Sequence, residues 1–185
     1  MIGYAFCGSF CTVAASILAL KALAAEADVL PIISDSFARF DTRFGKAGEI
    51  ISEIEGICGK SAVRTIVDAE PLGPALPLDA MIIAPCTGNT LAKLACGITD
   101  TPVTMAAKAH LRQGRPLIIA LASNDAMSAN LKNIALLSMR KSIYFVPMQQ
   151  DDPERKPDSL VADFSLIPDA LNAAFEDRQL RPLFL

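Results

Sequence analysis

Small polar residues follow four apolar segments of the sequence, and together they could bind a phosphorylated ligand. They are Gly8 and Ser9, then Ser34, then Thr87, Gly88, Asn89 and Thr90, and finally Ser123 and Asn124. Glycine allows a tight turn, while hydroxyl groups and the free N–H groups at the start of a helix can hold an anion without lysine. We therefore predict a polar crevice for a phosphorylated ligand. The alternative is that each group is an ordinary helix cap or turn.

Histidine and cysteine restrict the other chemistry that the chain could perform. His110 is the single histidine, which excludes metal sites that need two or more, and we predict no metal. The five cysteines lack C-x-x-C spacing and favour free thiols over disulfides or a zinc ribbon: Cys7, Cys11, Cys58, Cys86 and Cys96. A thiol near the crevice could act as a nucleophile, but a small buried residue is the favoured interpretation. His110 is expected to lie exposed on a helix, and the residues identify no catalytic group.

Composition indicates a folded protein and argues against two kinds of partner. The 185 residues are 52% hydrophobic with a mean hydropathy of +0.38, which excludes intrinsic disorder. The net charge is −3 and no block of Lys or Arg stands out, so nucleic acid is not an expected partner. Residues 1–20 are uncharged, but they lack a basic start and are interrupted by Gly, Ser and Thr, which favours a buried strand and helix over a secretion signal. We expect a cytoplasmic protein that does not bind membranes.

Two kinds of hydrophobic periodicity alternate along the chain. Strands are predicted at 2–7, 29–34, 80–84, 116–122 and 143–147. Helices are predicted at 12–26, 47–56, 90–96, 103–111, 129–139 and 168–178, with polar loops at 35–44 and 151–158. Residues 61–70 fit a short helix or a strand equally well.

Short apolar strands that alternate with helices are typical of a parallel sheet covered on both faces. No repeat, low-complexity tract or linker divides the sequence. We therefore predict an α/β fold over residues 1–185, a single doubly wound, Rossmann-like (flavodoxin-like) domain with a central, mainly parallel sheet. Ligands of such sheets bind at the carboxyl ends of the strands, which is where the polar residues of the crevice lie.

One long segment of the sequence resembles a known family. Ala84-Pro-Cys-Thr-Gly-Asn-Thr-Leu-Ala-Lys-Leu-Ala-Cys-Gly-Ile-Thr-Asp100 is similar to the hallmark segment of the homo-oligomeric flavin-containing cysteine decarboxylases. Gly8-Ser9 resembles the flavin-phosphate turn of that family, and Ser34 matches the end of its second strand. The resemblance implies that the crevice is an FMN site, with the Ser9 hydroxyl on the phosphate.

Further segments resemble one branch of this family, the B subunits of dipicolinate synthases. They are Asp41-Thr-Arg-Phe-Gly45, Ala69-Glu-Pro-Leu-Gly-Pro74, Thr101-Pro-Val-Thr-Met-Ala-Ala-Lys108 and Gln150-Asp-Asp-Pro153, and the resemblance covers nearly the whole chain. It implies an oxidoreductase subunit that helps to oxidise a dihydrodipicolinate-type precursor to dipicolinate, in the mother cell of a sporulating bacterium. It also implies a partner, the A subunit of dipicolinate synthase, which resembles a dehydrogenase and would carry NAD(P).

Two other functions stay open beside this one. Decarboxylating members of the family carry a histidine just before the third strand, whereas residues 70–79 contain none, so an FMN-dependent decarboxylase is the second choice. The third is a non-catalytic subunit that supports a dehydrogenase partner. Which subunit transfers the hydride does not follow from the sequence.

The resemblance also implies a substrate contact and an assembly. Arg39 and Arg43 are the only cations of the segment 36–44, and arginine binds carboxylates of a small dicarboxylate substrate in a bidentate manner; the alternative is that both are solvated. Members of the family form homo-trimers or dodecamers, so we expect a homo-oligomer. The helix at 90–96 or the segment 101–108 could pack between protomers, or both could simply cover the sheet.

Overall fold

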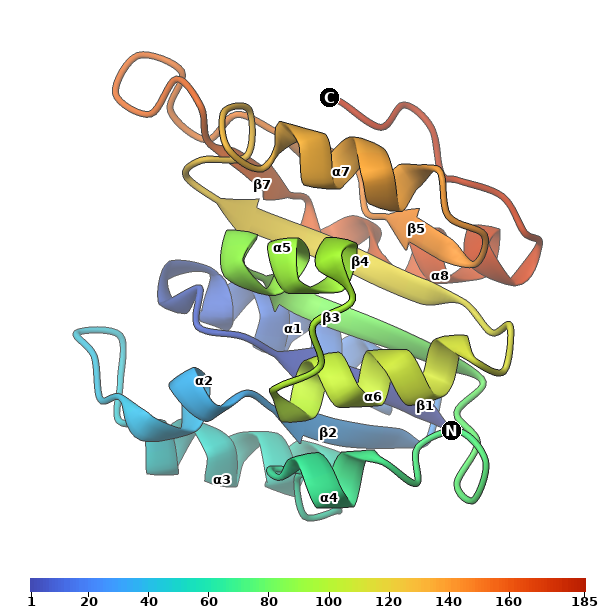
Figure 1. Ribbon diagram of the computed structural model, residues 1–185. Helices are drawn as coiled ribbons and strands as arrows, with labels where there is room; N and C mark the ends of the chain where they lie inside the picture. The colour runs from blue at the N-terminus through green and yellow to red at the C-terminus, as the bar shows by residue number, and fades with distance from the viewer.

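A central sheet runs through the computed structural model, which describes residues 1–185 (Figure 1). Its strands are β1 (Ile2–Phe6), β2 (Val29–Ile33), β3 (Ala80–Cys86), β4 (Leu117–Ser123), β5 (Ile143–Phe145), β6 (Met148–Gln149) and β7 (Leu160–Ala162). The order is β2-β1-β3-β4, and the outer edge of β4 pairs with β5 near its start and with β7 near its end. β1 to β5 are parallel, in the order of flavodoxin-like folds, while β7 is antiparallel to β4 and β6. The predicted α/β fold is confirmed.

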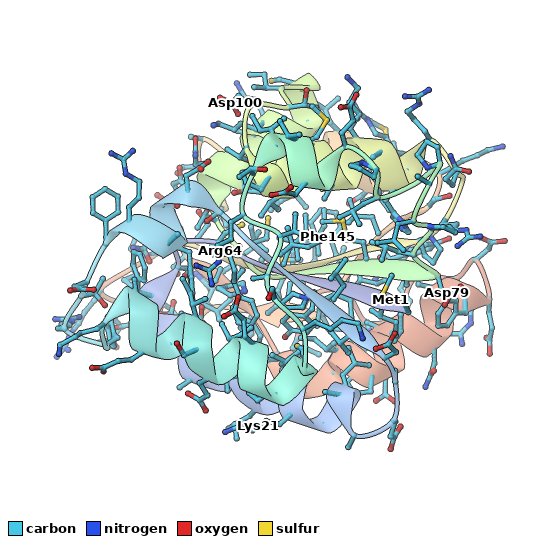
Figure 2. All side chains as sticks on the ribbon, turned by 90° about the horizontal axis from the view of Figure 1, so that it is seen from below. Met1, Lys21, Arg64, Asp79, Asp100 and Phe145 are labelled. Atoms are coloured by element: carbon cyan, nitrogen blue, oxygen red, sulfur yellow. The ribbon has the colours of Figure 1, made fainter.

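Both faces of the sheet are buried, because successive strand residues point to opposite sides and nearly all of them are apolar. In β1, Tyr4 and Phe6 enter one core cluster, while Ala5 and the adjacent Cys7 enter the other. Each cluster contains 26 buried residues, so neither face is left to solvent. The layers are seen from below in Figure 2, where Phe145 lies in the interior.

The helices divide between the two faces of the sheet. They are α1 (Val13–Ala24), α2 (Asp35–Arg39), α3 (Ala47–Cys58), α4 (Ile66–Ala69), α5 (Gly88–Cys96), α6 (Pro102–Leu111), α7 (Leu131–Ser138) and α8 (Ile167–Phe175), with 3-10 turns η1 (Phe10–Thr12) and η2 (Phe164–Leu166). Buried residues of α1, α3 and α8 share one core cluster, and those of α5, α6 and α7 share the other. No helix has the length and apolar character needed to cross a lipid bilayer.

Three segments differ from the sequence-based prediction. The expected loop 35–44 begins with α2, because Ser34 caps it by accepting a hydrogen bond from the Phe37 N–H. The strand predicted at 80–84 continues past Pro85 to Cys86, since the Pro85 carbonyl accepts a bond from the Cys7 N–H at 3.2 Å. The ambiguous segment 61–70 contains both a single bridge from Val63 to β2 and the short helix α4.

The antiparallel pair β6 and β7 is absent from the prediction. Each strand is only two or three residues long, so neither has a measurable period. They form because the outer edge of β4 beyond Ile119 has no β5 partner, and β7 pairs there with Ala122 and Ser123. Tertiary pairing, which local sequence does not encode, therefore decides these two strands.

Candidate functional site

The carboxyl ends of β1, β2 and β3 meet at one edge of the sheet. β1 lies between β2 and β3, and the chain leaves β1 toward α1 on one face but leaves β3 toward α5 on the other. This reversal of strand order is where ligands bind in open α/β sheets. A cavity of ≈ 310 Å³, here called the polar cavity, opens at this point. It is lined by Ser34, Asp35, Ser36, Arg39, Phe40, Thr87, Asn89, Thr90, Lys93, Asp100 and Thr101.

The structure brings together residues that lie in separate segments of the sequence. Ser34, Thr87, Asn89 and Thr90, which were predicted cofactor residues, all line the polar cavity, as does the predicted substrate residue Arg39. Most of them belong to the ends of β2 and β3 or to the helices that follow. The remaining predicted residues lie outside its lining, for the reasons given below.

Ser34 fixes the wall of the polar cavity that follows β2. Its side chain is buried, and its Oγ accepts a hydrogen bond from the Phe37 N–H at 3.3 Å, which starts α2. The Ser36 Oγ lies 3.3 Å from the Ser34 Oγ. The helix α2 makes little more than one turn, so Arg39 at its end lies on the same wall of the polar cavity as Ser34. Cap and cavity lining are thus two roles of one serine.

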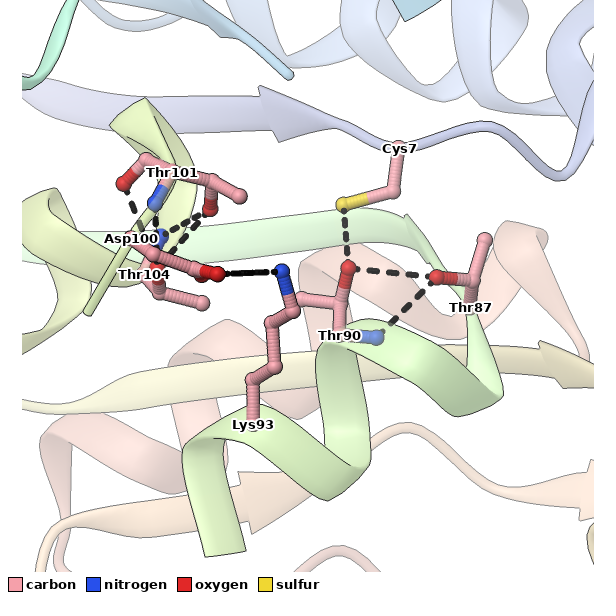
Figure 3. A network of polar contacts seen from close by, with 7 residues as sticks. All are labelled: Cys7, Thr87, Thr90, Lys93, Asp100, Thr101 and Thr104. Carbon is pink, nitrogen blue, oxygen red and sulfur yellow. Dashed lines mark hydrogen bonds and ion pairs between the residues drawn. The ribbon is translucent and has the colours of Figure 1, made fainter. Parts of the chain in front are cut away.

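A chain of hydroxyl groups joins α5 to β1 on the other side (Figure 3). The Thr87 Oγ1 accepts a bond from the Thr90 N–H at 3.2 Å and donates to the Thr90 Oγ1 at 3.1 Å. The Thr90 Oγ1 donates in turn to the Cys7 Sγ at 3.3 Å. Burial raises the pKa of Cys7 to about 11 and the pKa of Cys86 well above its usual range. Both cysteines are buried as expected, and neither is suited to act as a nucleophile at neutral pH.

An ion pair that was not predicted from the sequence closes one side of the polar cavity. The Lys93 Nζ lies 2.8 and 3.0 Å from the two carboxylate oxygens of Asp100, and both residues are part of the lining (Figure 3). The hydrogen bond from Lys93 is the main reason that the pKa of Asp100 is lowered. Lys93 lies one helical turn after Asn89, so the two residues share a face of α5. This spacing is the sequence signal that could have placed Lys93 at the site.

Gly8 and Ser9 do not line the polar cavity, although Gly8 lies close to one of its lining residues. A Cβ atom on Gly8 would lie 3.2 Å from the Ser36 Oγ. The turn that follows β1 therefore lies close to the wall of the polar cavity that follows β2. Ser9 is half-buried, and its Oγ lies 3.3 Å from the Thr12 Oγ1. The helix that follows begins with the 3-10 turn η1, and Ser9 makes no side-chain cap bond to it.

The polar residues after β4 form a separate network. Ser123 donates to Asp125, and the Asp125 carboxylate also accepts a bond from the Asn130 Nδ2 at 3.0 Å. A Cβ on Gly88 would lie 2.5 Å from the Ser123 Oγ, so this network packs against the first residue of α5 from outside the polar cavity. Asn124 is exposed and accepts a bond from the Ser159 Oγ at 3.5 Å. These contacts support the wall of the site rather than line it.

The two arginines of the segment 36–44 have different surroundings. Arg39 lines the polar cavity and forms no ion pair within the chain. Arg43 lies outside it, 4.8 Å from the ring centroid of Phe44, beyond a bridge between Thr42 and Gly45. Of the two, Arg39 is therefore positioned for a ligand in the polar cavity.

His110 corrects one prediction. The expected exposed histidine is fully buried at the end of α6, with its Nε2 donating to the Pro116 carbonyl at 2.9 Å. Burial lowers the pKa of this histidine. The hydrogen bond holds the ring against Pro116, the residue that precedes β4. It does not line the polar cavity and cannot serve there as a base.

The donors around the polar cavity suit an anionic group. The first N–H groups of α5, at Gly88 and Asn89, have no partner within the helix, and its positive dipole end faces the same side. Hydroxyl groups from Ser34, Ser36 and Thr87 surround the opening. This donor set fits the phosphate of a nucleotide-like cofactor such as FMN.

Comparison with known proteins agrees with this geometry. The Flavoprotein family matches residues 3–174. The B subunit of dipicolinate synthase from Bacillus subtilis is 43% identical over 185 residues, which are 100% of this chain and 92% of that protein. The crystal structure of the dipicolinate synthase B subunit from Bacillus halodurans superposes with a TM-score of 0.91 at 40% identity, over 100% of this chain and 95% of the other.

A more distant structure shares the fold. The FMN-dependent cysteine decarboxylase SpaF matches with a TM-score of 0.70 at 21% identity, and 95% of each chain is covered. The family match extends over nearly the whole chain, and the relative from Bacillus subtilis is matched from end to end of this sequence. The chain belongs to the Flavoprotein family, in the branch of the dipicolinate synthase B subunits.

Proposed function

We propose that this chain binds FMN in the polar cavity and acts as the flavoprotein subunit of a dipicolinate synthase, oxidising a dihydrodipicolinate-type precursor during sporulation. The observation that carries the proposal is the convergence of Ser34, Thr87, Asn89 and Thr90 on one cavity at the reversal of strand order. Identity of 43% along the full chain to a dipicolinate synthase B subunit supports the choice of reaction.

The residues of the chain bind and orient, and a bound flavin would supply the hydride chemistry. Serine and threonine hydroxyls with the α5 N–H groups hold the phosphate, and Gly8 and Ser9 border it. Arg39 binds one carboxylate of the substrate by a paired hydrogen bond. The Lys93–Asp100 ion pair, with atoms 2.8 Å apart, keeps the α5–α6 loop against the cavity. The partner is the dehydrogenase-like A subunit of the synthase, which carries NAD(P), and the chain itself forms a homo-oligomer.

The decarboxylase alternative has no histidine base. Residues 70–79 contain no histidine, and the buried His110 is bonded to the Pro116 carbonyl. No other feature of the polar cavity favours decarboxylation over oxidation.

Titration of the purified chain with FMN tests the cofactor. Asn89→Ala removes an exposed amide of the polar cavity that caps no helix, and Asn124→Ala is the matched control outside the cavity. We expect the first substitution to weaken FMN binding by up to about tenfold, as for one net hydrogen bond, and the second to leave it unchanged.

Activity in the presence of the A subunit of dipicolinate synthase tests the reaction. Conversion of the precursor should require FMN on this chain and should fall with Arg39→Gln. Full activity from flavin-free protein would instead support the non-catalytic role, and weaker binding only in Asn124→Ala would move the flavin away from the polar cavity.

A further inference from the structure

Charge is unevenly distributed along the sequence. Residues 101–150 contain six Lys or Arg residues and one acidic residue, Asp125, so they carry +5 in a chain whose net charge is −3. These residues include α6, β4, α7, β5 and β6. Because β4 and β5 are buried, the cations lie on α6, on α7 and in the loops that follow these helices, over one face of the sheet (Figure 1).

A second cavity, of ≈ 390 Å³, lies between α5, α6 and the end of α7. Three cations line it: Lys108 lies on α6, Arg112 is the residue directly after α6, and Arg140 follows α7. Thr99 and Thr104 add hydroxyl groups, and no carboxylate takes part in the lining. We call it the basic cavity. Its volume is within the range of small-molecule sites, about 300–1,000 Å³.

The charges of the basic cavity are not neutralised within the chain. Lys108, Arg112 and Arg140 form no ion pair, whereas the nearby Lys93 and Arg115 are both paired with aspartates. Positive charges that surround a concave surface without counter-charges attract small anions strongly.

Arg140 is held in place before any ligand binds. Its Nη1 and Nη2 donate to the carbonyls of Leu94 and Ala95 at 3.4 and 3.0 Å, at the end of α5. A guanidinium has five N–H donors, so others remain for a ligand. On α6 and its C-cap, Lys108 and Arg112 are four residues apart and therefore share one side of the helix. The basic cavity therefore has two positive walls.

We propose that the basic cavity binds a small dicarboxylate, with one carboxylate on Arg140 and the other on Lys108 and Arg112. A dicarboxylate presents two separate anionic groups, one for each wall, whereas a phosphate presents one, and a concave site of this size suits a small molecule better than a protein surface. The choice of a dicarboxylate rests on the proposed function, whose substrate and product belong to that class.

The basic cavity is distinct from the polar cavity. The loop between α5 and α6 separates them: Gly97 and Thr99 line the basic cavity, while Asp100 and Thr101 line the polar cavity. A dicarboxylate in the basic cavity therefore lies outside the proposed flavin site and contacts the loop that carries Asp100. It would be a second ligand of the chain, additional to the reacting substrate.

Calorimetric titration of the full chain with dipicolinate tests the proposal. Lys108→Gln/Arg112→Gln should weaken binding at least about tenfold, because charge-assisted hydrogen bonds are lost from one wall. Lys132→Gln is the control, since Lys132 belongs to the same basic segment but does not line the cavity, and it should bind as wild type does. Picolinate, with a single carboxylate, and inorganic phosphate should both bind at least about tenfold more weakly than dipicolinate.

Three results would overturn the proposal. One is equal dipicolinate affinity of wild type and the double variant, and another is picolinate or phosphate binding as tight as that of dipicolinate. The third is binding that is lost in Arg39→Gln but kept in the double variant, which would move the dicarboxylate to the polar cavity. FMN titration of the double variant should match wild type and shows that the variant is folded. A failure of FMN to bind to wild type would contradict the proposed function alone, because the dipicolinate titration does not depend on it.

Discussion

Some residues at this site have two roles, so the residue type alone does not show which role a residue has. Ser34 and Thr87 are helix caps and also line the polar cavity, so a capping role does not exclude a residue from the predicted crevice. Polar residue types at strand ends were sufficient to predict four residues that line the polar cavity: Ser34, Thr87, Asn89 and Thr90. They could not indicate that Ser123 and Asn124 lie outside it, because that depends on the direction in which the chain turns after β4.

Gly88 shows how closely the supporting network packs, and Gly88→Ala should destabilise the protein. The added Cβ would lie 2.5 Å from the Ser123 Oγ, 2.6 Å from the Asn130 Nδ2 and 2.8 Å from the Asp125 Oδ1. Ser123 and Asn130 both donate to the Asp125 carboxylate, so the three side chains cannot move independently. We expect a loss of about 1–3 kcal/mol in the free energy of unfolding, measured by urea denaturation.

Gly56→Ala is the matched control for this substitution. Gly56 is exposed within α3, and nothing lies within 4 Å of the position of its Cβ. Alanine there should stabilise the protein by about 0.4–1 kcal/mol, because it lowers the entropy of the unfolded chain. Equal effects of the two substitutions would show that the network after β4 has room for a methyl group.

At the scale of elements, long periodic segments were predictable and short ones were not. The five parallel strands and the helices α1, α3, α5 and α6 follow from apolar runs and from stop signals such as Gly97, which ends α5 in the left-handed conformation with φ +71°. The strands β6 and β7 depend on strand pairing, and the helix α2 depends on a single cap. Hydrophobic periodicity reveals neither. The inward rotation of α6 that buries His110 is likewise set by packing against the sheet.

The buried end of α6 should make stability depend on pH. His110 donates through Nε2 to the Pro116 carbonyl, and its Nδ1 is buried without a partner, so the ring is neutral in the folded protein. Burial lowers its pKa, while the unfolded chain titrates near the ordinary value of about 6.5. Below that pH the unfolded state binds the additional proton, and the free energy of unfolding falls as the pH falls.

His110→Gln isolates this contribution. Glutamine can still donate to the Pro116 carbonyl but does not titrate. The titration of the carboxylates affects the stability of both proteins alike, so it cancels in the comparison. We expect wild type to lose more of its free energy of unfolding than the variant does between about pH 7 and pH 5, measured by denaturant titration at each pH. Parallel pH profiles for the two proteins would mean that the imidazole is protonated in the folded state as well.

On the scale of the whole molecule, the two helical layers use their apolar residues differently. Leu91 and Leu94 of α5 and Val103 and Ala106 of α6 are buried against the chain's own sheet, so the inner faces of these helices are not available to another protomer. By contrast, α1 has one charged residue, Lys21, and its outer side is apolar. Helices that are apolar all round are normally covered.

The α1 surface is therefore where the expected homo-oligomer should form. Leu18 is 68% exposed at its centre, between one groove that includes Phe10 and Phe44 and another that includes Phe164 and Pro168. Leu18→Glu should convert the oligomer to a species of 19.7 kDa in light scattering, because it buries an unpaired charge in the interface.

Val67→Glu provides the control for the α1 surface. Val67 is 75% exposed on α4, on the other helical layer, and its replacement adds the same charge without touching α1. The oligomer should keep its mass in this variant. Dissociation by Val67→Glu but not by Leu18→Glu would assign the contact to the α4 side, and a wild-type mass of 19.7 kDa would contradict the homo-oligomer itself.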